Sequence, residues 1–439
     1  MKNAWTEKYR QGSQMQASIS PSTTFKRPLG HIECIHYILN SYVKILRNVV
    51  VTVEVEKSIS INLIKSFLQS AHNNFIALRL KTREGDNKPI FLSGVPHSSI
   101  PIRIININSD EKFGFISVVE HEMNEPINSN NHMWRATVLQ MANSNVLILT
   151  FHHSIFDGRS IIKLLSHMAS AEACQAKVNT SSLYTAIEQN IHLAIPPSST
   201  TSQKKSDKLD VKYLTDKPCE INDQKSKFLI IDLEKIRVDS LRKLCKKNNI
   251  TINALINAAA IKAISINFPA HNGIAVHTPI DLTKYSNESH YNDELGCFIA
   301  IIHSLVKDFK DKNLLEIARL YKEEFSNDLS GFSPKKNYDF IDLKNNLIRN
   351  YNKTTSEFSG GICISNIGEI ILGTKNEISS IKEIYFSTSV FGGLGILILS
   401  ALTFNNQLKV TLSYTSPLLN EEFINSFIAS FKTTLLAVK

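Results

Sequence analysis

The sequence predicts an α/β protein built from two domains. Its 439 residues exceed the length of one ordinary domain. Short β-prone runs alternate with longer segments in which apolar residues recur at helical spacing. Residues 194–226, which begin AIPPSSTTSQKKSDKLD, combine a proline pair with serine, threonine and charge, as linkers and surface crossovers do. We therefore place the domain boundary in this stretch.

Composition favours well-packed cores and a reducing compartment. The chain is 43% hydrophobic and 20% charged, and its net charge of +9 is spread over isolated lysine doublets. This spread favours a solvated surface over nucleic-acid binding, although a modest positive field would suit a phosphate-bearing donor or an acidic carrier protein. The six cysteines form neither a CxxC pair nor a compact disulfide pattern.

No segment predicts secretion or a membrane span. The N-terminus, MKNAWTEKYRQGSQMQ, lacks the apolar core of a secretory signal. The most apolar stretch, Phe391–Phe404, has fourteen residues, which is too short to cross a bilayer and indicates a buried strand. We expect a soluble, cytoplasmic protein.

The N-terminal half begins with a loosely ordered polar arm over residues 1–26. Trp134 opens an alternating strand, which indicates a core side chain rather than a platform for a ligand. The predicted strands are Asn48–Glu56, Ile102–Ile107, Phe113–Val119 and Trp134–Met141, and the predicted helix is Ile61–Asn73.

The C-terminal half shows the same alternation. Thr251 is the expected N-cap of an alanine-rich helix, and Asn405 and Asn406 are expected to join the last two strands as a hairpin. The predicted strands are Phe228–Asp232, Gly273–Asp281, Ile384–Ser389, Gly395–Phe404 and Gln407–Tyr414. The predicted helices are Leu233–Asn248, residues 250–267, Leu314–Phe325 and Asn420–Leu436.

Chemistry is concentrated in residues 145–160, NVLILTFHHSIFDGRS. A β-prone apolar run ends in His152 and His153. Asp157 and Gly158 follow, and a helical pattern then runs to about Lys177. A histidine at the end of a rigid strand can remove a proton from a hydroxyl or amine and return it to a leaving group. The Gly158 N–H could stabilise an oxyanion.

Other interpretations of these residues remain open. Asp157 could cap the helix, or brace the loop through an ion pair. The two histidines could form a structural pair or ligate a metal, but no cysteine, histidine or carboxylate lies nearby at a ligand-like interval.

The segment HHSIFDG resembles the HHxxxDG motif of the condensation-domain and CoA-dependent acyltransferase superfamily. That group includes chloramphenicol-acetyltransferase-like enzymes, peptide condensation domains, plant acyltransferases and alcohol acetyltransferases. The resemblance implies two chloramphenicol-acetyltransferase-like domains, residues 27–193 and 227–439, with mixed sheets flanked by helices and an active-site tunnel at their interface. It implies that His153 is the catalytic base, and that His152 and Asp157 are mainly structural, with Asp157 in a salt bridge.

Weaker matches extend the resemblance over residues 27–437. The stretch Arg27-Pro28-Leu29-Gly30, together with Glu33, is similar to the start of alcohol acetyltransferases. FIALRL at residues 75–80 resembles a family segment, which implies a structural role for Arg79. LGCFI at residues 295–299 resembles a segment of condensation domains. GGICISNIG at residues 360–368 resembles a strand that would bring Ser365 or Asn366 to the oxyanion. A simple turn is the alternative for this strand.

One departure concerns the salt bridge of Asp157. Gly273–Asp281 and the following Leu282 resemble a strand end after which relatives carry an arginine, but this chain has Thr283 and Lys284. Lys284, or an arginine elsewhere such as Arg27, would have to supply the charge, and lysine lacks the planar fork of arginine.

The implied activity is transfer of an acyl group from a thioester to a hydroxyl or amine. The donor would be acyl-CoA or an acyl carrier protein as co-substrate, the acceptor a small molecule, and neither a metal, a cofactor nor an acyl-enzyme is required. The absence of a GxSxG motif agrees with direct transfer. Two alternatives are an inactive protein of this fold that binds or scaffolds, and a condensation domain acting in trans.

Overall fold

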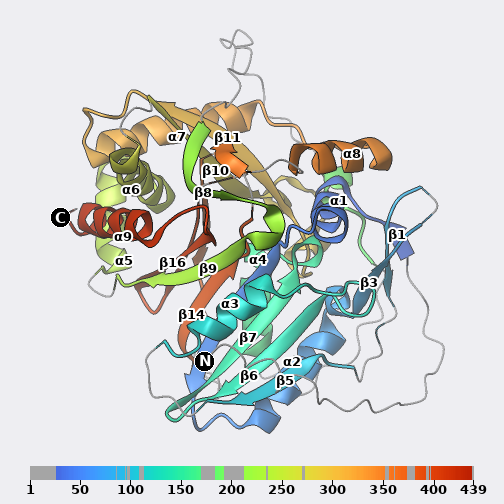
Figure 1. Cartoon of the computed structure of the whole chain (residues 1–439). Coiled ribbons are helices and arrows are strands. Elements are labelled where there is room, and N and C mark those ends of the chain that lie inside the picture. Colours follow the sequence, from blue (N-terminus) through green and yellow to red (C-terminus); the bar gives the residue numbers. More distant parts are fainter. Residues whose placement is uncertain are drawn as a thin grey trace.

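A computed structural model gives the structure of the protein (Figure 1). It describes residues 26–85, 87–93, 95, 99–107, 113–169, 183–191, 212–233, 236–268, 272–351, 355–359, 361–372, 381–391, 395 and 397–437. The predicted N-terminal arm lies outside the described residues except for Lys26, as does the predicted helix beyond residue 169.

A five-stranded sheet carries the HHSIFDG segment. Its order is β14 (Ile381–Thr388), β2 (Asn48–Glu56), β7 (Ser144–His152), β6 (Trp134–Gln140) and β5 (Ile102–Asn106). All neighbours are antiparallel except β5 and β6. Every residue of β7 is buried, as expected for a central strand covered on both faces. The edge strand β14 comes from the C-terminal part of the chain and lies beside β2 (Figure 1).

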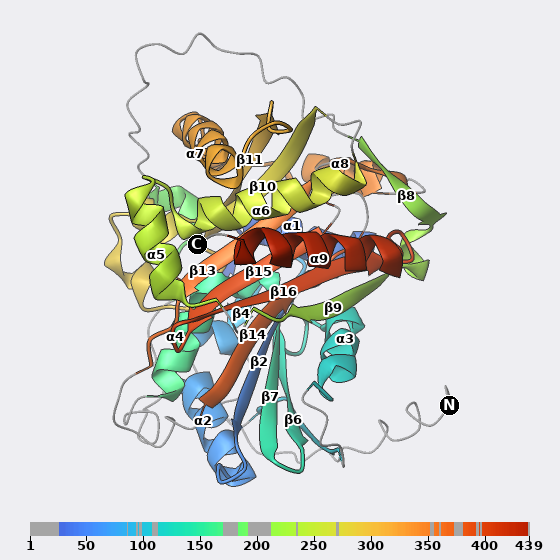
Figure 2. The same ribbon diagram turned by 90° about the vertical axis from the view of Figure 1, so that its left-hand side faces the viewer.

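A six-stranded sheet forms the second large sheet of the structure. Its order is β11 (Ile299–Lys307), β10 (Gly273–Asp281), β13 (Ile362–Glu369), β15 (Leu397–Phe404), β16 (Gln407–Ser416) and β9 (Lys225–Ile231). Strand β13 is parallel to both β10 and β15, so this sheet is also mixed. Figure 2 shows α6 (Ile252–Asn267) and α9 (Glu421–Leu436) side by side across it. Helices α5 (Val238–Lys247) and α7 (Leu314–Ser330) both pack against α6.

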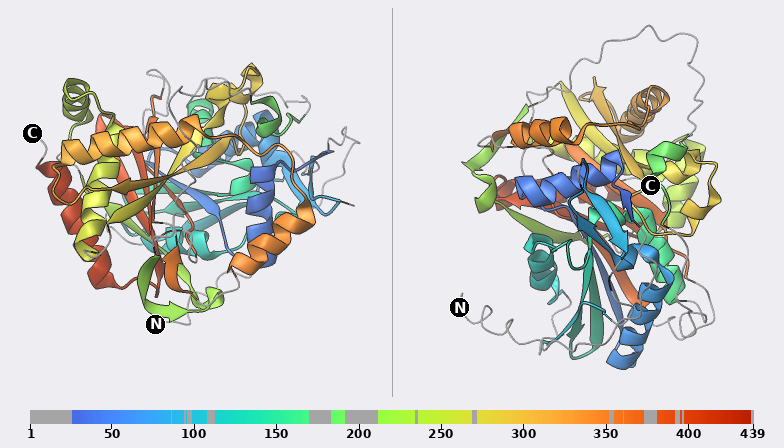
Figure 3. Two further views of the ribbon diagram at one scale, coloured as in Figure 1. Left: turned by 90° about the horizontal axis from the view of Figure 1, so that it is seen from above. Right: turned by 90° about the vertical axis from the view of Figure 1, so that its right-hand side faces the viewer.

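The remaining elements cover the first sheet and link the two halves. Helices α2 (Ile61–Asn74) and α4 (Gly158–Met168) pack together, and α3 (Ile116–Asn124) lies against β2 and β9. Figure 3 shows α8 (Phe340–Tyr351) next to α1 (His31–Ile38). The small sheets are β1 (Lys26–Pro28), β4 (Ile90–Ser93) and β3 (Leu80–Arg83), and the pair β12 (Thr355–Ser359) and β8 (Lys212–Cys219).

The predicted fold class is confirmed: mixed sheets are flanked by helices. Most predicted strands and helices are present within a few residues of their expected bounds. The predicted strand over Phe113–Val119 is wrong, because this stretch enters α3. Its isoleucine and valines favour strands locally, but Val118, Val119, Glu122 and Met123 all become buried on one side of a helix. Tertiary packing therefore overrides the local propensity.

Part of the predicted linker is regular structure. Within 194–226, residues 212–219 form β8, whose partner β12 lies more than a hundred residues later in the chain. Helices α1 and α8 were not predicted, because polar side chains interrupt the apolar pattern of both. In the described part of the chain no single helix is long and apolar enough to cross a membrane. Only α5 and α6 together pass that test, and they meet at 94°.

Candidate active site

The HHSIFDG segment forms a sharp corner between a strand and a helix. Strand β7 ends at His152, a short 3₁₀ turn covers His153–Ile155, and α4 begins at Gly158. The strand and the helix are both anchored in the hydrophobic core. The corner is therefore held rigidly from both sides, as a catalytic loop requires.

His152 has a structural role. The residue is 2% exposed, and its Nδ1 accepts a hydrogen bond from the Ser154 backbone N–H at 3.2 Å. Burial, with a smaller effect of neighbouring His153, lowers its pKa to about 3. The Ser154 hydroxyl lies 2.8 Å from the same nitrogen and donates to the Glu33 carbonyl at 3.1 Å, which ties the corner to α1. A neutral, acceptor-only Nδ1 thus shapes the turn.

His153 is half-buried and stacks on His36 of α1. The ring centroids are 4.2 Å apart with an interplanar angle of 16°. Burial lowers the pKa of His153 to about 4, the nearby charge of Arg47 adds to this effect, and backbone groups of His153 and Phe156 offset part of it. Its Nδ1 makes no hydrogen bond of standard geometry. At neutral pH the ring is therefore uncharged and able to accept a proton.

A metal does not suit this histidine pair as it stands. Ligand atoms of His36, His153 and Cys297 lie within 4.8 Å of one another. An imidazole binds a metal in its own ring plane, and two nearly parallel stacked planes share no such position. Burial also raises the pKa of the Cys297 thiol well above its usual range, so this ligand is protonated. The stacking therefore disfavours a metal shared by His36 and His153.

Asp157 caps α4 and joins the two halves of the chain. It is fully buried; one carboxylate oxygen accepts from the Ser160 N–H at 2.8 Å and the Ser160 hydroxyl at 3.0 Å. The other accepts from the Phe298 N–H at 2.9 Å. Phe298 belongs to LGCFI. The two segments HHSIFDG and LGCFI, each of which resembles the superfamily independently, are therefore hydrogen-bonded to each other. Asp157 therefore both caps the helix and braces the loop, two roles between which the sequence left the choice open.

The predicted ion pair of Asp157 is not formed. Lys284 is exposed in a 3₁₀ turn, while Asp157 is fully buried, and no ion pair joins them in the described part of the chain. Arg27 bonds Glu33 instead. The charge that acts on Asp157 is that of Lys163, further along α4: burial raises the pKa of Asp157 and Lys163 opposes that rise. The Lys163 ammonium donates to the carbonyls of Tyr291 and Glu294, each at 2.6 Å.

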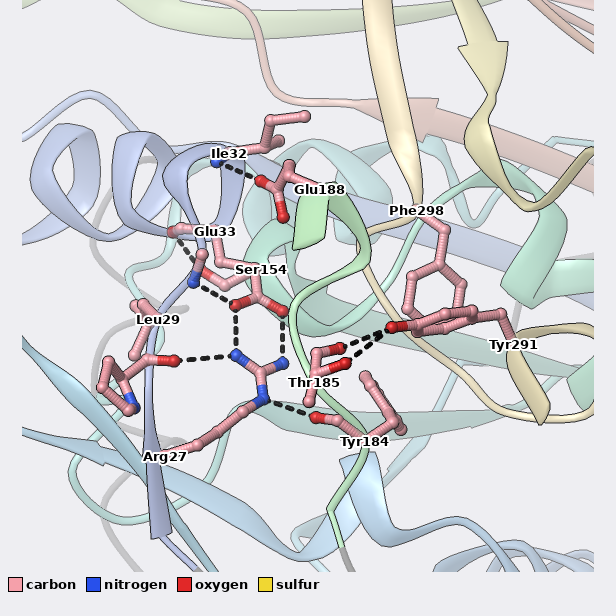
Figure 4. Close-up of polar contacts among 12 residues, drawn as sticks. Arg27, Leu29, Ile32, Glu33, Ser154, Tyr184, Thr185, Glu188, Tyr291 and Phe298 are labelled. Atoms are coloured by element: carbon pink, nitrogen blue, oxygen red, sulfur yellow. Dashed lines mark hydrogen bonds and ion pairs between the residues drawn. The ribbon is translucent and has the colours of Figure 1, made fainter. Parts of the chain in front are cut away.

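Arg27 and Glu33 hold α1 in place (Figure 4). Two guanidinium nitrogens of Arg27 donate to the two oxygens of Glu33 at 2.7 Å each, and the third donates to the Tyr184 carbonyl at 2.7 Å. Glu33 also accepts from the Gly30 N–H at 2.7 Å, and Glu188 accepts from the Ile32 N–H at 2.9 Å. A buried bidentate pair of this kind fixes geometry strongly. It therefore sets the position of His36 against His153.

Strand β13 meets the HHSIFDG corner at Gly158. A Cβ at Gly158 would lie 2.4 Å from Cγ2 of Ile367. Side chains alternate across a strand, so Cys363, Ser365 and Ile367 share one face. Asn366 lies on the other face, and its side-chain oxygen accepts from the Gly368 N–H at 3.0 Å in a bulge where Gly368 has φ +85°. Of the two predicted oxyanion residues, Ser365 is on the face that meets Gly158, and Asn366 shapes the turn.

Substituting Gly158 by alanine should damage both stability and the corner. The added methyl group collides with Ile367, and such overpacking costs about 1–3 kcal/mol. We expect a matching loss in the free energy of urea unfolding, which Ile367→Ala should partly relieve in the double variant because it removes the colliding Cγ2. Gly331→Ala, where an added Cβ meets nothing closer than 3.8 Å, is the matched control. Equal stability of Gly158→Ala and the control would contradict the close approach.

Sequence reasoning missed several residues of this site. His36, Lys163 and Cys297 reach it from α1, α4 and the LGCFI segment. Two of them carried a usable signal: Lys163 follows Asp157 closely on the same predicted helix, and Cys297 lies in the LGCFI match. The expected structural roles of Arg79 and Trp134 are confirmed: both are buried, Arg79 donates to the His72 carbonyl at 3.1 Å, and the Trp134 indole donates to the Leu78 carbonyl at 2.9 Å.

A cavity of about 880 Å³ lies between the two halves of the chain, and its described lining does not include the residues of the corner. Asn40 and Leu46 of the first half and Phe391 of the second are among the residues that line it. Four cationic side chains also line it: Lys44, Lys81, Arg83 and Lys225. Asn40 follows His36 by one helical turn, so one wall of the cavity continues toward the stacked histidines.

No protein-family model and no curated protein sequence matches this chain. Solved structures do. The trichothecene 15-O-acetyltransferase TRI3 from Fusarium sporotrichioides is 11% identical, with a TM-score of 0.68 over 95% of this chain and 96% of that one. The first condensation domain of the CDA synthetase is 9% identical, with a TM-score of 0.67 over 95% and 97%. The epimerization domain from the third module of tyrocidine synthetase B is 14% identical, with a TM-score of 0.62 over 96% and 98%.

These likenesses show that the chain has the condensation-domain fold, with its two chloramphenicol-acetyltransferase-like halves. They cover nearly the whole of both chains in each comparison, so the resemblance drawn from HHSIFDG is confirmed at the level of the fold. The three proteins named have different activities, and the reaction must therefore be argued from the site itself.

Proposed function

We propose that this protein is an acyltransferase that moves an acyl group from a thioester to a hydroxyl or amine acceptor. The observation that carries the proposal is His153: a neutral, half-buried imidazole at the end of a buried strand, with the ring steadied by stacking on His36. The thioester is that of acyl-CoA or of an acyl carrier protein, and no other cofactor is needed.

The reaction follows from the position of this base. His153 takes the proton of the acceptor hydroxyl or amine as its oxygen or nitrogen attacks the thioester carbonyl carbon. The tetrahedral oxyanion is stabilised by the Gly158 N–H and the Ser365 hydroxyl. When the intermediate collapses, the C–S bond breaks and the protonated His153 gives its proton to the departing thiolate. The new ester or amide and the free thiol leave with no net change in the enzyme.

The described cysteines do not favour a covalent route. Burial raises the pKa of Cys297 well above its usual range and that of Cys363 to about 12, so neither is a thiolate at neutral pH. Direct transfer needs only the one base that the corner provides.

The test is turnover of short- and long-chain acyl-CoAs with a panel of alcohols and amines, followed by mass spectrometry of the products. Carrier-bound acyl groups form the second arm. Acylated products in either arm support the proposal and identify donor and acceptor together. If the folded wild-type protein turns over no thioester in either arm, the proposal is wrong and a binding or scaffold function is favoured instead.

The pH dependence should report the same base. The pKa of free His153 lies near 4, because burial and Arg47 disfavour the imidazolium. The neutral imidazole therefore predominates above that pH. We expect kcat/KM to be constant between about pH 5 and 8 and to fall about tenfold for each pH unit below about pH 4. Initial rates in overlapping buffers measure this. A fall centred on pH 6.5, the pKa of free histidine, would contradict the buried base.

A further inference from the structure

A single arginine, Arg47, lies near His153 and has no acceptor among the residues that the structure describes. Arg47 immediately precedes β2, whose first residue, Asn48, pairs with His152 across the sheet. It is half-buried, and its charge acts on His36, His153 and Cys363. These three residues come from α1, the catalytic corner and β13. The guanidinium therefore lies where the three elements converge.

The isolation of Arg47 is unusual within this chain. A guanidinium has five N–H donors, and a half-buried one normally bonds carboxylates or carbonyls. No hydrogen bond or ion pair joins Arg47 to another residue that the structure describes. The other described arginines that are not exposed all have acceptors: Arg27 has Glu33, Arg79 has backbone carbonyls, and Arg103 and Arg135 share Glu122.

Other polar groups around this position also lack partners. In the described part of the chain, Nδ1 of His36 and the side-chain oxygen of Asn40 are buried and make no hydrogen bond, and Nδ1 of His153 makes none of standard geometry. Asn40, like Leu46 next to Arg47, lines the cavity of about 880 Å³. Buried polar atoms are normally satisfied, so these groups, which lie near an arginine that has no acceptor in the described part of the chain, point to a polar ligand.

We propose that Arg47 binds a carboxylate of the substrate, so that this acyltransferase acts on an acidic acceptor or transfers an acidic acyl chain. The inference rests on the proposed function and names its substrate class. A planar guanidinium pairs with a carboxylate through two parallel hydrogen bonds, which also orients the bound molecule. The phosphates of a pantetheine donor lie at the far end of its arm, whereas Arg47 acts on the catalytic ring itself.

The carboxylate also prepares the base. The groups that face His153 are His36 and His152, both neutral, Cys297, which is protonated, and Arg47, which alone is charged. An unpaired Arg47 opposes the imidazolium that forms as the acceptor loses its proton. A bound carboxylate neutralises this charge, and proton transfer to His153 then becomes easier only when the correct substrate is present.

The kinetic test compares acidic substrates with uncharged analogues of the same shape. One arm offers hydroxy and amino acids against their amides as acceptors; the other offers succinyl-CoA against butyryl-CoA as donors, so the two arms show which partner carries the carboxylate. Charge-assisted hydrogen bonds are lost in Arg47→Gln, which should lower the ratio of kcat/KM for the acid to kcat/KM for its neutral analogue about 10- to 100-fold. Arg319→Gln, on an exposed face of α7, is the matched control.

A binding measurement keeps this inference separate from the proposed function. In protein carrying ¹³C-labelled histidine, succinate should shift the titration of the His153 resonance to higher pH, and succinamide should not. The shift should vanish in Arg47→Gln and persist in Arg319→Gln. Absence of a shift in the wild type, or an equal acid preference in wild type and Arg47→Gln, would overturn the role of Arg47. Failure of all thioester turnover would overturn the proposed function alone.

Discussion

Replacing His153 by alanine is expected to lower kcat/KM for acyl transfer by about 10²- to 10⁴-fold, the usual contribution of a general base. The variant removes the nitrogen that receives the acceptor proton. The titratable groups next to it in the described part of the chain are His36, which stacks on the ring, and Cys297, whose thiol is protonated. Binding of the thioester should change little, so the loss should fall mainly on kcat. Product formation by mass spectrometry under saturating donor measures it.

Two comparisons separate chemistry from folding in this experiment. His153 is half-buried in a turn rather than packed in a core, so thermal unfolding of His153→Ala should match the wild type. His290→Ala removes an exposed histidine and should retain full activity. Retained transfer in a folded His153→Ala protein would show that the base lies elsewhere.

Replacing Asp157 by alanine should have the largest effect on stability. The Ser160 and Phe298 N–H groups lose their only charged acceptor, and α4 loses its N-cap. A lost cap costs about 0.5–2 kcal/mol and a buried unsatisfied donor about 1–3 kcal/mol, so we expect a total of about 2–4 kcal/mol. The free energy of urea unfolding measures this. Activity should fall as well, since the same bonds fix the corner that carries His153.

The conservative variant Asp157→Asn sharpens this prediction. The oxygen of the new amide could still accept from Ser160, but the amide NH₂ group would face the Phe298 N–H, and two donors cannot bond each other. Asp157→Asn should therefore restore the cap without restoring the bridge, and its stability should lie between those of the wild type and Asp157→Ala. Asp342→Ala, at an exposed position of α8, should stay within about 0.5 kcal/mol of the wild type. Wild-type stability in Asp157→Ala would contradict the bridge.

Elements with strong local patterns could be predicted from the sequence. Strand β10 has the predicted bounds, Gly273–Asp281. Thr251 caps α6 as expected, accepting from the Ala254 N–H at 3.0 Å, and β7 is buried throughout, as its continuous apolar run indicated. The helix α3 could not be predicted, because its valines locally favour a strand. Only its packing against β2 and β9 makes this segment a helix.

The site divides in the same way. The strand, turn and helix of the HHSIFDG corner could be predicted from the sequence alone, because all three lie within residues 145–160 and need no distant partner to be recognised. The partners of that corner were decided by tertiary structure: Phe298 and Lys163, rather than Lys284, surround Asp157, and His36 stacks on His153. Arg47 faces the same ring from the start of β2. Burial and charge across three separate elements set these contacts, and no local pattern encodes them.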